Sequence, residues 1–128
     1  MKVIIAGSRY KDSERKIPFD DYLAVVNAIK NSNFNITEVI SGCAIGVDKL
    51  GEKWANVNNC PIILMPADWN RYNKAAGPIR NRQMAEIADA AVIIWNGKSS
   101  GTLNMINEMK RLNKPYFIDI IRENEDPT

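Results

Sequence analysis

Five short apolar runs, separated by longer amphipathic stretches, constrain the fold of this chain more than any other feature of its sequence. They are rich in β-branched residues and mostly apolar on consecutive positions, which is typical of strands buried on both faces. The runs are Lys2–Ala6, Glu38–Ile40, Ile62–Met65, Ala91–Trp95 and Tyr116–Ile120. Strands of this kind occur mainly in parallel sheets that carry helices on both faces.

The stretches between the runs repeat apolar residues at the spacing of an α-helix with one buried face. Alternating strands and helices predict an α/β fold, a Rossmann-like three-layer sandwich with a mostly parallel five-stranded sheet. We expect a single domain over residues 1–121 and a frayed, charged tail over residues 122–128. The helical sets are Tyr22, Val25, Val26 and Ile29, then Val47, Leu50, Trp54 and Val57, and finally Met105, Ile106, Met109 and Leu112.

The composition excludes several classes of function. With 128 residues, 45% hydrophobic and 25% charged, the chain has the make-up of one ordinary globular domain. The longest apolar run is too short to span a bilayer, and the N-terminus lacks the apolar core of a signal peptide, so we expect a cytoplasmic protein without a membrane partner. The sequence has no histidine, which excludes a histidine-based triad and histidine-ligated zinc, and we predict neither a metal nor a cofactor.

Four loops follow the first four predicted strands and hold many small and charged residues. In an open α/β sheet, ligands bind outside the carboxyl ends of the strands, near the point where the strand order reverses. We therefore expect all four loops to open onto one edge of the sheet. The loops are Gly7–Arg9, Ser41–Asp48, Pro66–Arg82 and Gly97–Thr102.

The loop Gly97–Thr102 combines two glycines, three hydroxyl side chains and Lys98 directly before a predicted helix. Backbone N–H groups and the helix dipole at such a junction favour a bound phosphate, and glycines let a phosphate approach the backbone. The alternative is a plain capped turn, with Ser100 or Thr102 as the N-cap of the helix. The three other loops at the same edge favour phosphate binding.

The first two loops each have two interpretations. The segment Gly7–Arg9 either places a donor and a cation in the crevice or merely turns the chain. In the second loop, Gly42 permits a tight turn, and Asp48 falls in the first turn of the next helix, where the dipole favours a negative charge. Asp48 either accepts a hydrogen bond from a ribose hydroxyl, or caps the helix and pairs with an arginine.

Helix geometry separates the two arginines of the third loop. In a helix that starts near Pro78, Arg80 shares the stripe that faces the sheet and the crevice, which makes it a candidate ligand contact. Arg82 points nearly the opposite way, toward solvent or a partner subunit. Earlier in the loop, Trp69 either stacks on a base or covers the end of the core, and Lys74 adds a cation.

Together, four segments resemble the SLOG superfamily, in particular its small YspA/YpsA-related branch of bacteria and their phages. The resemblance implies a Rossmann-like protein, expected to be a homodimer, that binds nucleotides or nucleotide-derived ligands. Its relatives hydrolyse the N-glycosidic bond of nucleoside monophosphates (LOG-type enzymes), sense NAD-derived signals, or bind single-stranded DNA (DprA-type proteins). The segments, which cover nearly the whole chain, are GSR, SGCAIGVDKLGEKWA, PADWNRYNKAAGPIRNRQM and NGKSSGTLNM.

The resemblance to LOG-type enzymes is incomplete at the catalytic motif. Arg80 falls at the position of the catalytic arginine, and Gly101 and Thr102 match the phosphate-binding Gly-Thr pair. Asn104 stands where the catalytic glutamate belongs, two residues after that threonine. We therefore favour binding or sensing over catalysis. The alternative is a phosphoribohydrolase-like N-glycosidase in which Arg80 and Asp48 carry the reaction.

The predicted ligand is a nucleotide or nucleotide-derived molecule, such as ADP-ribose, an NAD-like compound or a nucleoside monophosphate. Single-stranded DNA is an alternative that we do not favour, because the net charge is only +2 and the basic residues form no stripe with interleaved aromatics. The predicted binding residues are Gly7, Ser8, Arg9, Ser41, Gly42, Asp48, Trp69, Lys74, Arg80, Asn81, Gly97, Ser99, Ser100, Gly101, Thr102 and Asn104.

Overall fold

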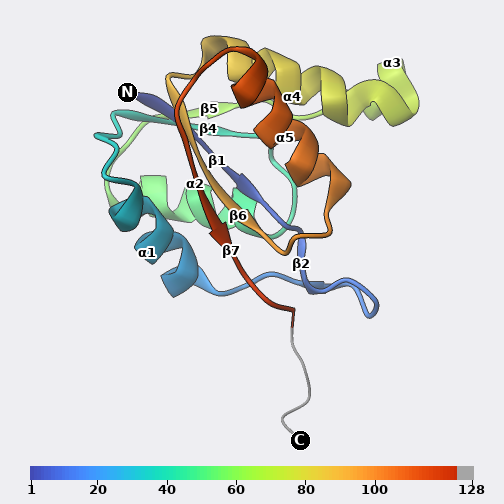
Figure 1. The fold of residues 1–128 in the computed structure, drawn as a ribbon, viewed down its shortest axis with the longest axis horizontal. Helices are drawn as coiled ribbons and strands as arrows, with labels where there is room; N and C mark the ends of the chain where they lie inside the picture. The colour runs from blue at the N-terminus through green and yellow to red at the C-terminus, as the bar shows by residue number, and fades with distance from the viewer. Residues whose placement is uncertain (124–128) are drawn as a thin grey trace, which may run out of the picture.

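A twisted five-stranded sheet forms the centre of the protein, and all its neighbouring strands run parallel (Figure 1). The structure is a computed structural model and describes residues 1–123. The strand order is β5-β4-β1-β6-β7, which confirms the predicted Rossmann-like α/β sandwich. The strands are β1 (Lys2–Gly7), β4 (Glu38–Ser41), β5 (Ile62–Leu64), β6 (Ala90–Trp95) and β7 (Tyr116–Ile120).

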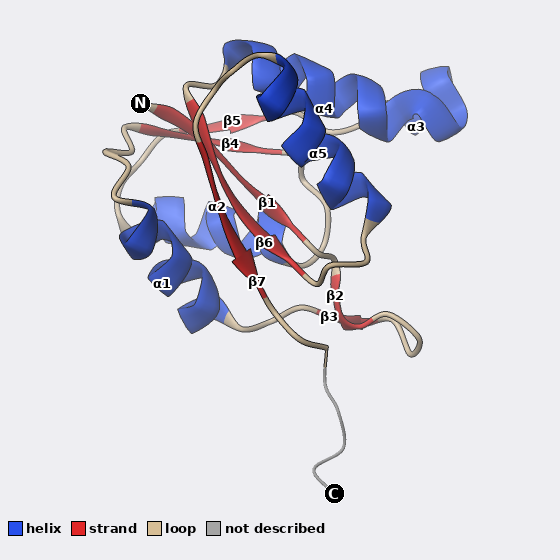
Figure 2. Cartoon of the chain, viewed as in Figure 1, coloured by secondary structure: helices blue, strands red, loops and turns tan. Residues whose placement is uncertain are grey.

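Helices cover both faces of the sheet (Figure 2). The helices α1 (Tyr22–Ser32) and α2 (Val47–Val57) pack on one face, and α4 (Ala76–Ile87) and α5 (Ser100–Arg111) pack on the other. Side chains alternate along β1, so that Val3 and Ile5 join the core under α1 and α2, while Ile4 joins the core under α4 and α5. The central strands are therefore buried on both sides, as their apolar sequences predict.

The structure adds short elements that the apolar pattern does not predict. A two-stranded antiparallel hairpin, β2 (Tyr10–Asp12) and β3 (Ile17–Pro18), follows β1 directly. A short helix α3 (Trp69–Tyr72) and a single turn η1 (Asn73–Ala75) lead into α4, which begins at Ala76 and so slightly before the predicted start near Pro78. These elements are too short to show a period in the sequence, and each lies beside the carboxyl ends of the strands.

Three residues that the apolar patterns predict to be buried are exposed: Val57, Leu64 and Ile120. Leu64 and Ile120 belong to β5 and β7, the two edge strands, which are less covered than the central ones. Val57 shares the predicted stripe of α2 in the sequence, yet 65% of its surface is accessible. The buried stripe of this helix runs through Val47, Gly51 and Ala55, and Val57 lies about 200° around the helix from Ala55. The predicted stripe steps three residues from Trp54 to Val57, and at the end of the helix this step places Val57 off the buried face.

The segment after β7 returns to the carboxyl edge of the sheet. Part of the tail that we expected to be frayed is held there, because Glu123 accepts hydrogen bonds from Ser13 and from Asn96 Nδ2 and lies 3.5 Å from Lys98 Nζ. The rest of that tail, residues 124–128, lies outside the described residues. None of the helices within residues 1–123 has the length and apolarity needed to cross a membrane.

Candidate functional site

A cavity of about 770 Å³ lies at the carboxyl ends of β1 and β6. The chain leaves β1 toward β4 and β5 on one side, and then crosses to β6 and β7 on the other side. A crevice at such a reversal of strand order is the usual ligand site of open α/β sheets. Loops after the first four predicted strands reach this edge, and each of the four supplies predicted residues to the cavity wall.

Most of the predicted binding residues line this cavity. Ser41, Gly42 and Gly97 do not. Ser41 is fully buried and donates its hydroxyl to Glu52, Gly42 is buried as well, and Gly97 lies in the turn before α5. The predicted residues in the lining are Gly7, Ser8, Arg9, Asp48, Trp69, Lys74, Arg80, Asn81, Ser99, Ser100, Gly101, Thr102 and Asn104.

The end of β1 forms the floor of the cavity and is bound tightly to β6. A Cβ atom on Gly7 would lie 2.0 Å from the carbonyl oxygen of Ile94, so only glycine allows the two strands to approach this closely. Ser8 is 1% exposed, and its Oγ accepts a hydrogen bond from the backbone N–H of Asn96 at 3.0 Å. Ser8 therefore joins the loops after β1 and β6 and places a hydroxyl in the wall.

Asn96 and Ser99 shape the loop that precedes α5. Asn96 Oδ1 accepts from the backbone N–H groups of Lys98 and Ser99, both at 2.9 Å. Ser99 is the N-cap of α5, since its Oγ accepts from the backbone N–H of Thr102 at 3.3 Å and from Thr102 Oγ1 at 3.1 Å. The expected alternative caps, Ser100 and Thr102, are instead the first and third residues of the helix.

The first turn of α5 faces the cavity with unused donors. The backbone N–H groups of Ser100 and Gly101 donate to no acceptor within residues 1–123. A Cβ atom on Gly101 would meet no protein atom within 4 Å, so packing of the protein does not require glycine there. The open space and the free N–H groups mark the position where an anion fits best.

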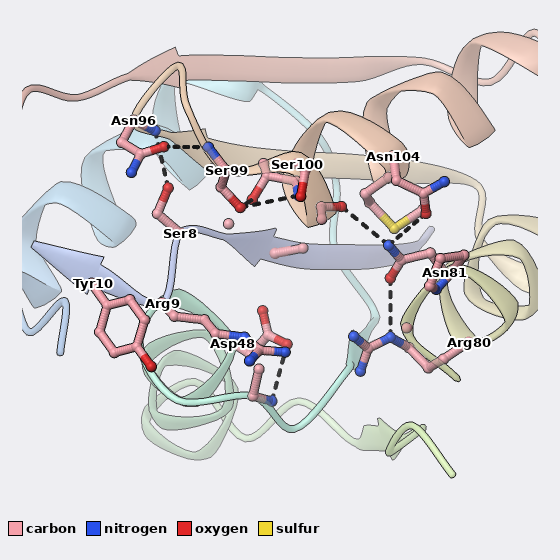
Figure 3. A pocket seen from close by; sticks show the side chains of 18 of the residues that line it. Ser8, Arg9, Tyr10, Asp48, Arg80, Asn81, Asn96, Ser99, Ser100 and Asn104 are labelled. Atoms are coloured by element: carbon pink, nitrogen blue, oxygen red, sulfur yellow. Dashed lines mark hydrogen bonds between the residues drawn. The ribbon is translucent and has the colours of Figure 1, made fainter. Parts of the chain in front are cut away.

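Asp48 lies across the cavity from Ser99 and Ser100, beside Arg9 (Figure 3). It is the second residue of α2, is 5% exposed, and accepts at Oδ2 from the backbone N–H of Ala44 at 3.2 Å. Burial raises the pKa of this carboxyl to about 6, although the Ala44 N–H and the charges of Arg80 and Arg9 act in the opposite direction. The expected pairing with an arginine does not occur, because no arginine of the described chain lies within 4.0 Å of Asp48.

Arg80, Asn81 and Asn104 form a connected group at one end of the cavity (Figure 3). Arg80 is 8% exposed and donates from Nη1 to the carbonyl oxygen of Gly42 and from Nε to Asn81 Oδ1 at 3.0 Å. Asn81 Nδ2 donates to Asn104 Oδ1 at 2.9 Å and to the Gly101 carbonyl oxygen at 3.2 Å. These bonds hold α4 against the first turn of α5.

Arg82 and Arg80 lie on different sides of α4. Arg82 is exposed and pairs with Glu86 at 3.7 Å, one turn further along the same helix. Arg80 is buried in the cavity wall. The separation of the two arginines follows the helix geometry predicted from the sequence.

Trp69 belongs to the cavity wall and does not cover the core. It is 49% exposed, and its Cη2 atom would lie 3.5 Å from a Cβ placed on Gly77 of α4. Lys74 in η1 lines the same wall. An aromatic ring and a cation therefore stand beside the open part of the cavity.

Three polar lining residues were given no role from the sequence: Tyr10, Ser13 and Asn96. Asn96 carried a usable signal, since asparagine before glycine at the end of a strand favours a turn in which its side chain binds the following backbone. Tyr10 and Ser13 reach the cavity only because the hairpin of β2 and β3 folds back after β1. The strands of this hairpin are too short for a periodic pattern in the sequence to predict them.

The fold and the site define a Rossmann-like α/β protein with a polar cavity at the switch point of its parallel sheet. The chain belongs to the YspA, cpYpsA-related SLOG family (YAcAr), whose model matches residues 1–72. It is also similar to the Gene 61 protein of Mycobacterium phage D29, with 31% identity over 124 residues, 91% of this chain and 94% of the phage protein. None of the solved structures matches the chain significantly. The family match ends before α4 and α5, so the roles of Arg80 and of the loop before α5 rest on the cavity itself.

Proposed function

We propose that this protein binds a phosphate-bearing nucleotide or nucleotide-derived ligand in the cavity, and that it acts by binding or sensing. The observation that carries the proposal is the first turn of α5, whose Ser100 and Gly101 N–H groups face the cavity without a described acceptor. Membership of the SLOG family agrees with a nucleotide-related ligand.

Phosphate is the anion that suits this wall. A helix N-terminus carries about half a positive charge, and free N–H groups there donate to anionic oxygens. Lys98, Lys74, Arg9 and Arg80 line the same cavity and add cationic side chains. The cluster is compact, which favours a small phosphorylated molecule over a long nucleic acid.

Trp69 supplies a surface for the base. Its ring is half exposed at the cavity wall, next to Gly77 of α4, which lines the same cavity. Stacking of a base on an aromatic ring contributes about 1–3 kcal/mol and tolerates different bases. We therefore assign the base to this side of the cavity and the phosphate to the α5 side.

Hydrolysis of the glycosidic bond is the second candidate, and one observation supports it. Asp48 is the one carboxylate among the described residues of the cavity lining, and a carboxylate is what an oxocarbenium-like transition state requires. Against this role, Asn104 carries no charge and is bonded to Asn81. We rank binding first for this reason.

A matched pair of substitutions at Gly101 tests the phosphate site. Both Gly101→Asp and Gly101→Asn fit the open space at this position, and they differ in charge alone. Calorimetric titration with AMP, ADP-ribose and NAD should detect binding to the wild type. A ligand that binds should also raise the apparent stability of the wild type, because it binds the folded state. The aspartate should reduce affinity by at least about tenfold relative to the asparagine.

Two results would contradict the proposal. One is the absence of binding by every phosphorylated nucleotide when circular dichroism shows a folded protein. The other is tight, salt-sensitive binding of long single-stranded oligonucleotides without binding of mononucleotides, which would point to nucleic acid as the partner.

A further inference from the structure

Asp48 is a buried carboxylate with an unused oxygen in a cavity otherwise lined by cations and neutral groups. The residue is 5% exposed, and its Oδ2 accepts from the backbone N–H of Ala44. Its Oδ1 accepts no hydrogen bond from residues 1–123. The side chain belongs to the cavity lining, so the free oxygen is available to a ligand.

The neighbouring arginines do not satisfy this oxygen. A Cβ on Gly42 would lie 2.6 Å from Arg80 Nη1 and 2.9 Å from Asp48 Oδ2, so the two side chains flank the same glycine. Arg80 nevertheless directs its Nη1 to the Gly42 carbonyl oxygen and its Nε to Asn81. Arg9 lies beside Asp48 in Figure 3, but outside ion-pair distance.

Asp48 does not cap α2, whose N-cap is Gly46, and its contact with Ala44 accounts for only one of the two oxygens. Holding the turn before α2 requires the contact from Oδ2 to Ala44, which an asparagine would also make. The free Oδ1 stays in a largely water-excluded place, and burial there raises the pKa of the carboxyl to about 6. Ionisation of this side chain therefore lowers the stability of the fold, and such a residue is typical of a binding or catalytic site.

The chemistry of this oxygen restricts what can face it. A phosphate is repelled by a carboxylate, and the described residues contain no group of three or more side chains that would bind a metal ion with Asp48. Within a nucleotide, this leaves the neutral groups that carry O–H or N–H donors. In a 5′-nucleotide the ribose lies between the phosphate and the base, and Asp48 lies across the cavity from the α5 turn (Figure 3).

We infer that Asp48 Oδ1 accepts a hydrogen bond from a ribose hydroxyl of the bound nucleotide, so that the cavity selects ribonucleotides over their deoxy counterparts. The inference rests on the proposed function and adds the sugar to it. A ligand that bears a phosphate on the same hydroxyl is rejected, because two negative charges would face each other without water.

The test compares AMP and ADP-ribose with their 2′-deoxy and 3′-deoxy counterparts by titration calorimetry at a pH of about 8, above the pKa of Asp48. Loss of one hydrogen bond to a charged acceptor should weaken binding of at least one deoxy compound by about tenfold. Asp48→Ala should bind the ribo and deoxy forms equally. Asp48→Asn, which can still contact Ala44, should lose most of the preference.

Asp68→Asn is the matched control. Asp68 is also a carboxylate at the start of a helix, as the N-cap of α3, but it does not line this cavity. The control should keep the wild-type preference for ribose. IMP, which lacks the exocyclic amino group of AMP, distinguishes a contact with the base from a contact with the sugar. Suppose that IMP binds about tenfold more weakly than AMP, that deoxy-AMP binds as well as AMP, and that Asp48→Ala removes the difference between AMP and IMP. Asp48 Oδ1 would then contact the base, and the inference would be overturned.

The remaining outcomes are also decisive. Equal binding of ribo and deoxy forms by the wild type overturns the inference while the proposed function stands. A ribose preference that survives Asp48→Ala places the hydroxyl contact elsewhere and overturns it as well. If no phosphorylated nucleotide binds at all, the proposed function fails, and the inference fails with it.

Discussion

Asn81 donates its side-chain amide to Asn104 across 2.9 Å, and this contact joins α4 to the first turn of α5. Asn104 stands where a LOG-type enzyme is expected to have its catalytic glutamate. The bond engages the side-chain oxygen of Asn104 with a neighbouring amide, and Arg80 orients that amide in turn. The position is thus part of a structural link between the two helices that wall the cavity.

From this contact we expect no appreciable release of base from AMP by the purified protein. Asparagine cannot act as a base or balance the charge of an oxocarbenium-like state. Chromatographic analysis of AMP incubated with the protein measures this directly, with a LOG-type enzyme as positive control. Turnover that disappears in Asp48→Asn would show that Asp48 replaces the glutamate, and the binding-only proposal would then be wrong.

Replacement of the two arginines of α4 should have unequal effects. Arg80→Ala is expected to weaken binding of AMP or ADP-ribose by about tenfold or more, the loss of a charge-assisted contact. Arg82→Ala removes an exposed pair with Glu86 and should change affinity by less than about twofold. Titration calorimetry measures both.

Because Arg80 is also bonded to Gly42 and Asn81, its replacement can lower stability as well as affinity. Urea unfolding of Arg80→Ala therefore accompanies the titrations, which are made where the variant is fully folded. A larger loss of affinity in Arg82→Ala than in Arg80→Ala would place the ligand on the other side of α4.

Asp48→Asn is predicted to stabilise the ligand-free protein at neutral pH. Between a pH of about 4 and 6 the unfolded chain has lost the Asp48 proton while the folded chain keeps it, because burial raises the folded pKa from 3.8 to about 6. The free energy of unfolding of the wild type therefore falls as the pH rises through this window, by about 3 kcal/mol at most. Asparagine does not titrate and avoids this loss.

Urea unfolding of the wild type and of Asp48→Asn, at a pH of about 4 and again at about 8, measures the effect. The advantage of the variant should be larger at the higher pH. Asp68→Asn, at a cap outside the cavity, should show no such growth. An advantage of Asp48→Asn that is the same at both pH values would mean that the carboxyl is not destabilised by burial.

Glu123→Gln should strengthen binding of ADP-ribose or AMP. Glu123 lies 3.5 Å from Lys98 Nζ and competes with a phosphate for that cation. Glutamine can still accept the hydrogen bonds from Ser13 and Asn96, so the change removes the charge and keeps the segment in place. Affinity should rise by a factor of about 2–5 at low ionic strength, and the gain should shrink in high salt.

Lys98→Gln provides the comparison. In that background the Glu123→Gln substitution should have no further effect on affinity, as expected for two residues that act through one ion pair. An equal gain in both backgrounds would show that Glu123 acts on the ligand without Lys98.

The sequence by itself determined the architecture and the edge at which the site lies. The strands at Lys2–Gly7 and Ala90–Trp95 are recognisable because burial on both faces leaves a run of apolar residues, and helices such as α5 because one buried face leaves a period. Parallel strands place their carboxyl ends together, so the loops that meet at the cavity were predictable from order alone. Both signals are local in the chain.

Only the tertiary structure decided which atoms of these loops remain free. Ser99 caps α5 in place of Ser100, Asp48 keeps one oxygen without a protein partner, and Asn104 is bonded to Asn81 from another helix. Glu123 reaches Ser13 from the opposite end of the chain. Such contacts join residues far apart in sequence, and they depend on how helices and loops pack against one another, which no periodic pattern encodes.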